Sequence, residues 1–283
     1  MKEGAAREDT AYWRGTTIRD CFIFFAIFNT RMSYLSRLQI KITVATLLLV
    51  ISFGKAFTQN TIRPIEQLIT DSSGWAGFKN ATKIARNQYE VLPADPVKAK
   101  DALYQTQVTT RSLMGAIIYF TGGILVDNGW IRILGSGNEK LPRSLPGWNK
   151  GKTYQNIGER PTFLLIADDA VGGFFAINAG GLGDEQGKVY YLAPDDLRWE
   201  SLHISYTDFI NFCLVGNLNK FYSGLRWENW KADMIKLGAN EGYSMYPYPW
   251  TLEGKDIDKV SKTAVPIQQL YDFETGELKK VKQ

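Results

Sequence analysis

The tripeptide Asp127-Asn128-Gly129 is the feature that most restricts how this chain can fold. It separates two short apolar runs, Ile124–Val126 and Trp130–Leu134. Asp, Asn and Gly tolerate the left-handed backbone of a tight hairpin turn, so the pattern predicts two antiparallel strands here. The preceding segment, Met114–Phe120, is rich in branched and aromatic residues, and we predict a third strand there, turning at Gly122-Gly123.

The order of the remaining patterns predicts an α+β fold with N-terminal helices, an antiparallel sheet of about six strands, and C-terminal helices. We expect one domain over residues 60–283. Further strands are predicted at 162–167, 173–178, 188–192 and 199–202. Helices are predicted at 61–70, 75–87, 97–107, from Ser205 onward, and at 225–237. The C-terminal tail is predicted to be irregular and rich in aromatic residues, with a strand-like segment at 265–273.

The N-terminal region has the layout of a secretory signal. Arg37 and Lys41 precede an apolar run, Ile42–Phe53, and small residues follow it. This run of about 12 residues is shorter than the roughly 20 that a membrane-spanning helix needs. We therefore predict that residues 32–58 are a cleaved signal peptide, that 1–31 are an over-extended start, and that the mature protein is periplasmic or secreted without a stable membrane span. The alternative is a signal anchor with a long basic region.

Charge and composition argue against several classes of function. The whole chain has 33 basic and 29 acidic residues; residues 1–59 hold 8 and 4 of them, which leaves 33 − 8 = 25 and 29 − 4 = 25 for the rest. A neutral domain lacks the basic field that binds phosphates, so we expect no nucleic-acid partner. Cys213 would stand alone after leader removal, in an apolar context typical of a core position. His203 is the only histidine and has no companion at ligand spacing, so we expect no metal and no cofactor.

The pair Asp168-Asp169 ends a predicted strand and admits two interpretations. Carboxylates in such a pair could act as acid and base together with His203, as in a periplasmic enzyme. Aspartates at strand ends also commonly form turns through hydrogen bonds to the backbone. Both interpretations stay open at this point.

Arginine and tryptophan residues near the first hairpin indicate a binding surface. Arg111, Arg132 and Arg143 flank the hairpin and the long segment 135–161, which also contains Trp148. Such residues are enriched where proteins contact partners, and loops of this length tend to be functional. We expect Arg111, Arg132, Arg143, Trp148, Asp168 and Asp169 to include the binding residues, with the long loop making the contact. The alternative is that Trp130, close to these arginines, is a core residue and that the arginines are solvated surface residues.

Several strings of this sequence resemble one bacterial family. They are 121–127 (TGGILVD), 129–137 (GWIRILGSG), 141–149 (LPRSLPGWN) and 164–178 (LLIADDAVGGFFAIN). Together they resemble the family called domain of unknown function 2625, over roughly residues 62–275. The resemblance assigns no activity.

A more remote resemblance is to the SUKH superfamily (Smi1/Knr4-like). It is carried by the acidic strand end at Asp168-Asp169, the following GFFAIN string, the segment 188–191, and the start of the helix at 206–210. This resemblance implies an α+β binding module of the type that confers immunity to a toxin by contact with it. Our hypothesis is an exported module that acts on an unidentified protein partner. The rivals are the enzyme using Asp168, Asp169 and His203, and a glycan or peptide binder using the aromatic tail.

Overall fold

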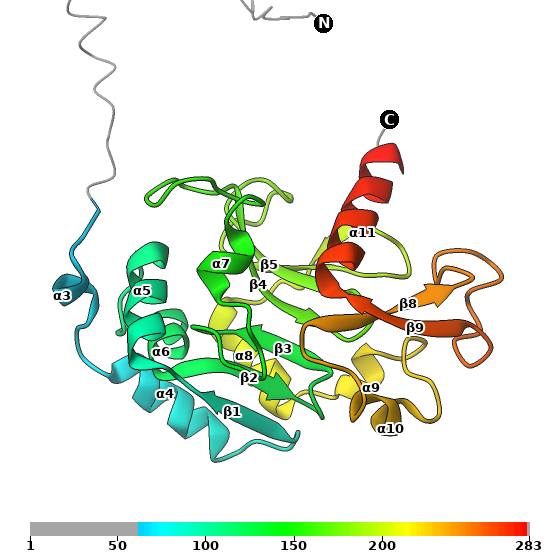
Figure 1. The fold of residues 1–283 in the computed structure, drawn as a ribbon, viewed down its shortest axis with the longest axis horizontal. Helices are drawn as coiled ribbons and strands as arrows, with labels where there is room; N and C mark the ends of the chain where they lie inside the picture. The colour runs from blue at the N-terminus through cyan, green and yellow to red at the C-terminus, as the bar shows by residue number, and fades with distance from the viewer. Residues whose placement is uncertain (1–61, 282–283) are drawn as a thin grey trace, which may run out of the picture. The chain divides into compact units, whose positions relative to one another are not determined.

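A seven-stranded antiparallel meander forms the centre of the fold, with consecutive strands lying side by side (Figure 1). The structure is a computed structural model and describes residues 62–281, so the predicted leader lies outside the described residues. The strands are β1 Tyr89–Pro93, β2 Thr121–Val126, β3 Ile131–Leu134, β4 Phe163–Asp169, β5 Phe174–Asn178, β6 Val189–Leu192 and β7 Trp199–Ser201. The predicted α+β class is confirmed, and β1 is a strand that the sequence patterns did not reveal.

The hairpin predicted at Asp127-Asn128-Gly129 joins β2 to β3, with Val126 opposite Ile131. All three turn residues have positive φ, at 51°, 60° and 81°. This backbone region is accessible mainly to Gly, Asn and Asp, which explains why these residues fix the turn. Trp130, the next residue, is fully buried and packs edge-on against Tyr222 and Trp230.

Within the described residues, four helices precede or interrupt the first strands: α3 Ile65–Leu68, α4 Ser73–Thr82, α5 Pro96–Thr106 and α6 Leu113–Phe120. The last of these corrects our prediction of a strand at Met114–Phe120. Ser112 Oγ accepts a hydrogen bond from the N–H of Gly115 at 3.0 Å, which caps the helix. The helix then packs against α4 and α5 and buries Ile117 and Ile118 completely. Packing against these two helices therefore outweighs the strand preference of branched residues.

A second region follows the meander and ends the chain. Its helices and strands are α8 Tyr206–Val215, α9 Leu218–Phe221, α10 Trp230–Met234, β8 Glu241–Tyr246, β9 Ser261–Pro266 and α11 Ile267–Val281. The predicted helix from Ser205 is confirmed, and Ser205 and Asp208 form a capping box at its start. The prediction of one helix over 225–237 is wrong in extent, because only 230–234 are helical.

The tail is more ordered than the sequence suggested. The two strands β8 and β9 form a separate antiparallel hairpin, and the segment 267–273 is helical instead of strand-like. Pro266 ends β9, and the buried residues of α11 recur at helical spacing: Ile267, Leu270, Tyr271, Glu274 and Leu278. Among residues 62–281, no helix has both the length and the apolar character that crossing a membrane requires.

Candidate functional site

Three of the charged residues singled out from the sequence meet in a buried ionic network. Arg132 Nε lies 2.6 Å from Asp168 Oδ1, and both side chains are almost fully buried. Arg143 reaches the same carboxylate through Nη1, and its Nη2 donates to Asp168 Oδ1 at 3.2 Å. One carboxylate thus neutralises part of two guanidinium charges, and the remaining N–H groups need other acceptors.

One acceptor is the carbonyl of Asp169, and the others lie on residues 239–241, where β8 begins. Arg132 Nη1 donates to the carbonyl of Glu241, and Arg143 donates to Asn240 Oδ1 at 2.7 Å and to the carbonyl of Ala239 at 2.9 Å. A backbone hydrogen bond also connects β8 to the main sheet region: the N–H of Tyr243 donates to the carbonyl of Ala170 at 2.7 Å. The ionic network therefore attaches the C-terminal hairpin to the main sheet.

Asp169 lies in the same region, but its carboxylate accepts hydrogen bonds from groups other than the two arginines. Its Oδ1 accepts from the N–H of Val171 and of Gly173, and Tyr191 Oη donates to its Oδ2 at 2.7 Å. A Cβ at Gly173 would lie 2.2 Å from Asp169 Oδ2, so the turn requires glycine. The turn-forming interpretation of Asp169 is thus the one that its contacts match. Glu274 of α11 packs close to this turn, and burial followed by the charge of Asp169 raises the pKa of Glu274 well above its ordinary value.

The other predicted candidates are scattered. Trp148 is only 5% exposed and lies in a short helix, α7 Leu145–Asn149, where the Arg143 guanidinium stands 4.8 Å from its ring centre. The segment 135–161 is therefore partly packed structure, and the premise that Arg143 and Trp148 stand free of the core on it is wrong. Arg111 is separate from the network: its side chain is 72% exposed and pairs with Asp71 at 3.0 Å.

The arrangement expected of the enzyme hypothesis is not formed. The His203 side chain is 76% exposed and pairs with Glu185 at 2.7 Å. Asp168 and Asp169 are buried and hold Arg132, Arg143 and Tyr191 instead. Within residues 62–281, no three His, Cys, Asp or Glu side chains gather as they would around a metal ion.

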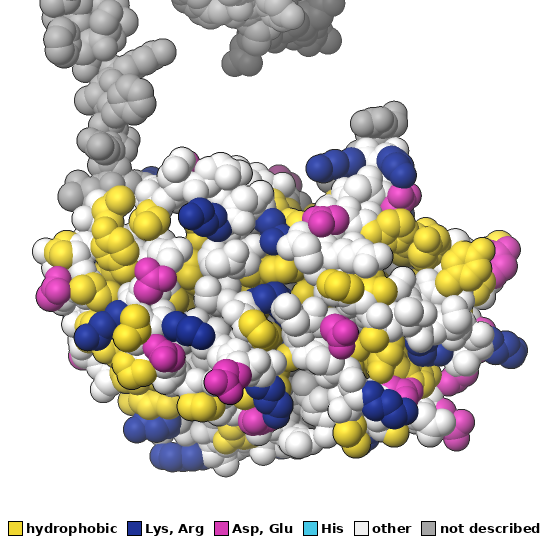
Figure 2. Space-filling model, in the orientation of Figure 1, with side chains coloured by type: hydrophobic (Ala, Val, Ile, Leu, Met, Phe, Trp, Pro, Cys, Tyr) yellow, Lys and Arg dark blue, Asp and Glu magenta, His cyan; other side chains and the backbone are white. Residues whose placement is uncertain are grey.

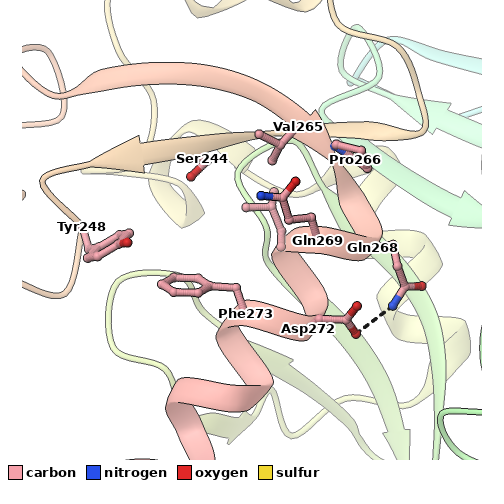
Figure 3. A pocket seen from close by; sticks show the side chains of 9 residues that line it. Ser244, Tyr248, Val265, Pro266, Gln268, Gln269, Asp272 and Phe273 are labelled. Carbon is pink, nitrogen blue, oxygen red and sulfur yellow. Dashed lines mark hydrogen bonds between the residues drawn. The ribbon is translucent and has the colours of Figure 1, made fainter.

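An open groove lies between the β8–β9 hairpin and α11, and we call it the C-terminal groove. Its volume is about 660 Å³. Figure 3 shows Tyr248 and Phe273 at one end, Gln269 and Ser244 above α11, and Asp272 toward the other end. Gln268 Nε2 donates to Asp272 Oδ1 at 2.8 Å, which holds that carboxylate in place. The lining residues are Ser244, Tyr248, Val265, Pro266, Gln268, Gln269, Leu270, Asp272 and Phe273.

The aromatic end of the groove continues into a cluster of one exposed and three half-buried aromatic side chains, which we call the aromatic rim: Tyr246, Tyr248, Trp250 and Phe273. The rings of Tyr248 and Trp250 stack at 4.5 Å with planes 5° apart, and Phe273 lies 5.2 Å from Tyr248. Tyr246 is 68% exposed, and the neighbouring Leu252 is 89% exposed. Figure 2 shows hydrophobic side chains gathered on the surface beside α11 and the hairpin.

The groove and rim supply the chemistry of recognition. Stacked rings offer large apolar faces at low entropy cost, and amide and carboxylate groups at the other end can orient a partner. The tail's aromatic residues were visible in the sequence. Their convergence with Phe273 was not, because the segment 265–273 was read as a strand.

Comparison of the sequence with known proteins identifies the family of this chain. The family described as "Protein of unknown function DUF2625" matches residues 65–270. The chain belongs to the DUF2625 family. It is similar to the protein YbfG of Escherichia coli (strain K12), with 45% identity over 214 residues that cover 75% of this chain and 96% of YbfG. It is also similar to an uncharacterized protein of Haemophilus influenzae (strain ATCC 51907 / DSM 11121 / KW20 / Rd), with 41% identity over 220 residues, 77% of this chain and 96% of that protein.

The DUF2625 match covers the whole ionic network but only part of the lining of the C-terminal groove. It includes the ionic network and both strands of the C-terminal hairpin, and it ends at Leu270 on α11. Asp272 and Phe273, which line the groove two and three residues further along α11, lie just beyond it. The residues that form the hairpin beside the groove therefore fall within the matched range, and part of the groove lining lies outside it.

Proposed function

We propose that this protein is an exported binding module that acts by protein–protein contact, with the C-terminal groove and the aromatic rim as its contact surface. The observation that carries the proposal is the partly exposed rim. Tyr246 and Leu252 are among the most exposed large hydrophobic side chains of the described residues, and they adjoin the stacked pair Tyr248 and Trp250. Exposed aromatic surface beside a groove is typical of interaction sites.

The rigidity of the site supports the same conclusion. The ionic network anchors residues 239–241, and α11 follows β9 without a loop. A contact surface held in place before binding loses less conformational entropy when the partner arrives. Export would bring this surface into the periplasm or outside the cell, and it rests on the sequence of residues 32–58. The resemblance to SUKH proteins adds an immunity-type role, in which the partner is a toxin.

Photo-crosslinking tests the proposal in living cells. A photoreactive residue in place of Leu252 should yield a crosslinked protein adduct, because position 252 borders the rim. The same residue in place of Val97, which is 77% exposed on α5, serves as the control and should not yield that adduct. In a Trp250→Ala background the Leu252 adduct should weaken severalfold. Equal yields at both positions, or a glycan adduct in place of a protein adduct, would refute the protein-contact function.

A further inference from the structure

Glu274 places a carboxyl group on the buried face of α11. Its side chain is only 3% exposed, and its Oε2 is buried without a hydrogen-bond partner within residues 62–281. The other buried side chains of this face are apolar or aromatic: Ile267, Leu270, Tyr271 and Leu278. A lone carboxylate is costly in such surroundings, so the group stays in its neutral, protonated form.

The Glu274 carboxyl lies against the turn that joins β4 to β5. A Cβ added at Gly172, where φ is 91°, would lie 2.4 Å from Glu274 Oε1 and 3.4 Å from Leu270 Cδ1. Two side chains of α11 therefore contact this glycine, which has both the backbone angle and the open space that they require. Leu270 also lines the C-terminal groove, so the contact that seats α11 on the turn is continuous with the wall of the groove.

Asp169 of β4 is the charged group that faces Glu274. Burial, and then the charge of Asp169, raise the pKa of Glu274 well above its ordinary value. Asp169 accepts hydrogen bonds from two backbone N–H groups and from Tyr191 Oη, and such donors stabilise its anion. The proton of this pair of carboxyl groups therefore resides on Glu274.

No neighbouring cation is available to neutralise an ionised Glu274. The titratable groups on the elements packed around α11 have other partners: Arg132 and Arg143 pair with Asp168, Lys152 lies 3.9 Å from the Trp148 ring centre, Glu241 accepts from the N–H of Gly238, Tyr243 Oη donates to the carbonyl of Asp233, and Lys262 donates to the carbonyl of Val260. Loss of the Glu274 proton would therefore leave two carboxylates facing each other in the interior, where their repulsion is weakly screened.

The helix can relieve this repulsion more easily than the sheet can. Asp169 is fixed within the meander, whereas α11 is the last element of the described residues and no later helix or strand covers it. Asp272 and Phe273, which precede Glu274 directly, line the groove and move with the helix. Displacement of α11 from the turn would therefore remove one wall of the C-terminal groove.

We propose that Glu274 and the β4–β5 turn form a latch, which holds α11 in place while the carboxyl is protonated and releases it on deprotonation, so that the C-terminal groove is lost as the pH rises. This regulation rests on the proposed function, because it controls the same contact surface. The sign follows from the geometry: the seated helix binds the proton and the released helix gives it up to solvent, so alkaline pH favours release.

Hydrogen–deuterium exchange of the full-length protein at pH 6 and pH 9 tests the latch without a partner. After correction for the intrinsic exchange rate at each pH, the protection of residues 267–281 should fall by about tenfold or more at pH 9, while that of α8 stays constant. Glu274→Gln keeps the shape of the neutral side chain and should retain its protection at both values. Glu66→Gln, at an exposed position on α3, is the matched control and should behave as the wild type does.

Equal protection of α11 at both pH values in the wild type would overturn the latch. An equal loss in Glu274→Gln, or a loss of the same size in α8, would also overturn it. The coupling to the groove is measured by the yield of the Leu252 crosslink, which should fall at pH 9 in the wild type and persist in Glu274→Gln. A yield that does not change while α11 is released would overturn this coupling. Absence of an adduct at either pH would refute the contact function, and the exchange result would still decide the latch.

Discussion

Arg132 Nε lies 2.6 Å from Asp168 Oδ1 in the interior of the protein, with both side chains excluded from solvent. Both residues were candidates for partner contact on the basis of the sequence. Their position instead makes them the joint between the main sheet and the β8–β9 hairpin, because Arg132 also donates to the carbonyls of Glu241 and Asp169. The groove depends on this joint for its position.

We expect Arg132→Met to destabilise the protein strongly. Removing one partner of a buried pair leaves an incompletely compensated charge on Asp168, at a cost of about 3–5 kcal/mol in the free energy of unfolding. Urea denaturation followed by circular dichroism measures this loss. The matched control is Arg111→Met, which removes an exposed pair with Asp71 and should cost about 0–1 kcal/mol. Similar losses in both variants would contradict the structural role of the buried network.

The indole of Trp130 is the centre of the aromatic packing behind the first hairpin. It is fully buried against Tyr222, Trp227 and Trp230. Trp130→Ala should therefore cost about 3–5 kcal/mol, mainly through the cavity that it leaves. Leu252→Ala, at an exposed position, should change the stability by less than about 0.5 kcal/mol. A thermal midpoint of Trp130→Ala within error of the wild type would place this side chain outside the core.

We expect the Glu274 carboxyl to make the free energy of unfolding depend on pH. Burial, and then the charge of Asp169, raise the pKa of the Glu274 carboxyl well above its ordinary value of 4.5. The unfolded chain releases this proton above about pH 4.5 while the folded protein retains it, so rising pH favours unfolding until the folded pKa is reached. Glu274→Gln stays neutral, and its stability relative to the wild type should increase steadily above pH 4.5.

Denaturation midpoints of both proteins between pH 4 and 9 measure this difference. A constant difference between Glu274→Gln and the wild type over this range would show that Glu274 does not keep its proton on folding.

Removal of a signal peptide during export would leave a defined N-terminus on the mature protein. If residues 32–58 are a signal peptide, the protein purified from its native host should begin between about Phe57 and Thr61. Intact-mass spectrometry identifies that N-terminus directly. A chain that retains Met1 or Met32 would contradict cleavage.

The fold class and the central hairpin could be predicted from the sequence because their signals are local. Asp127, Asn128 and Gly129 need no partner to favour a turn, and Ser205 with Asp208 marks a helix start. The α6 helix and β1 could not be read in the same way. Ile117 and Ile118 favour strands intrinsically, and only packing against α4 and α5 makes their segment helical.

The site was harder to predict because its residues are distant in sequence. Arg132, Arg143 and Asp168 were separate candidates from the sequence, and their meeting and burial depend on residues 239–241, which accept hydrogen bonds from both arginines. The aromatic rim joins Tyr248 to Phe273 across the hairpin. The spacing of Ile267, Leu270 and Glu274 carried the helical period that would have placed Phe273 beside the groove.

The affinity of the captured protein partner for rim variants tests the central claim most directly. Titration calorimetry of the wild type and of Tyr248→Ala should show binding weakened by about 2 kcal/mol or more, roughly thirtyfold, because aromatic anchors dominate such contacts. Val97→Ala, at an exposed position on α5, is the matched control and should bind as the wild type does. Equal affinity for the wild type and a folded Tyr248→Ala protein would contradict the claim that the aromatic rim is the contact surface.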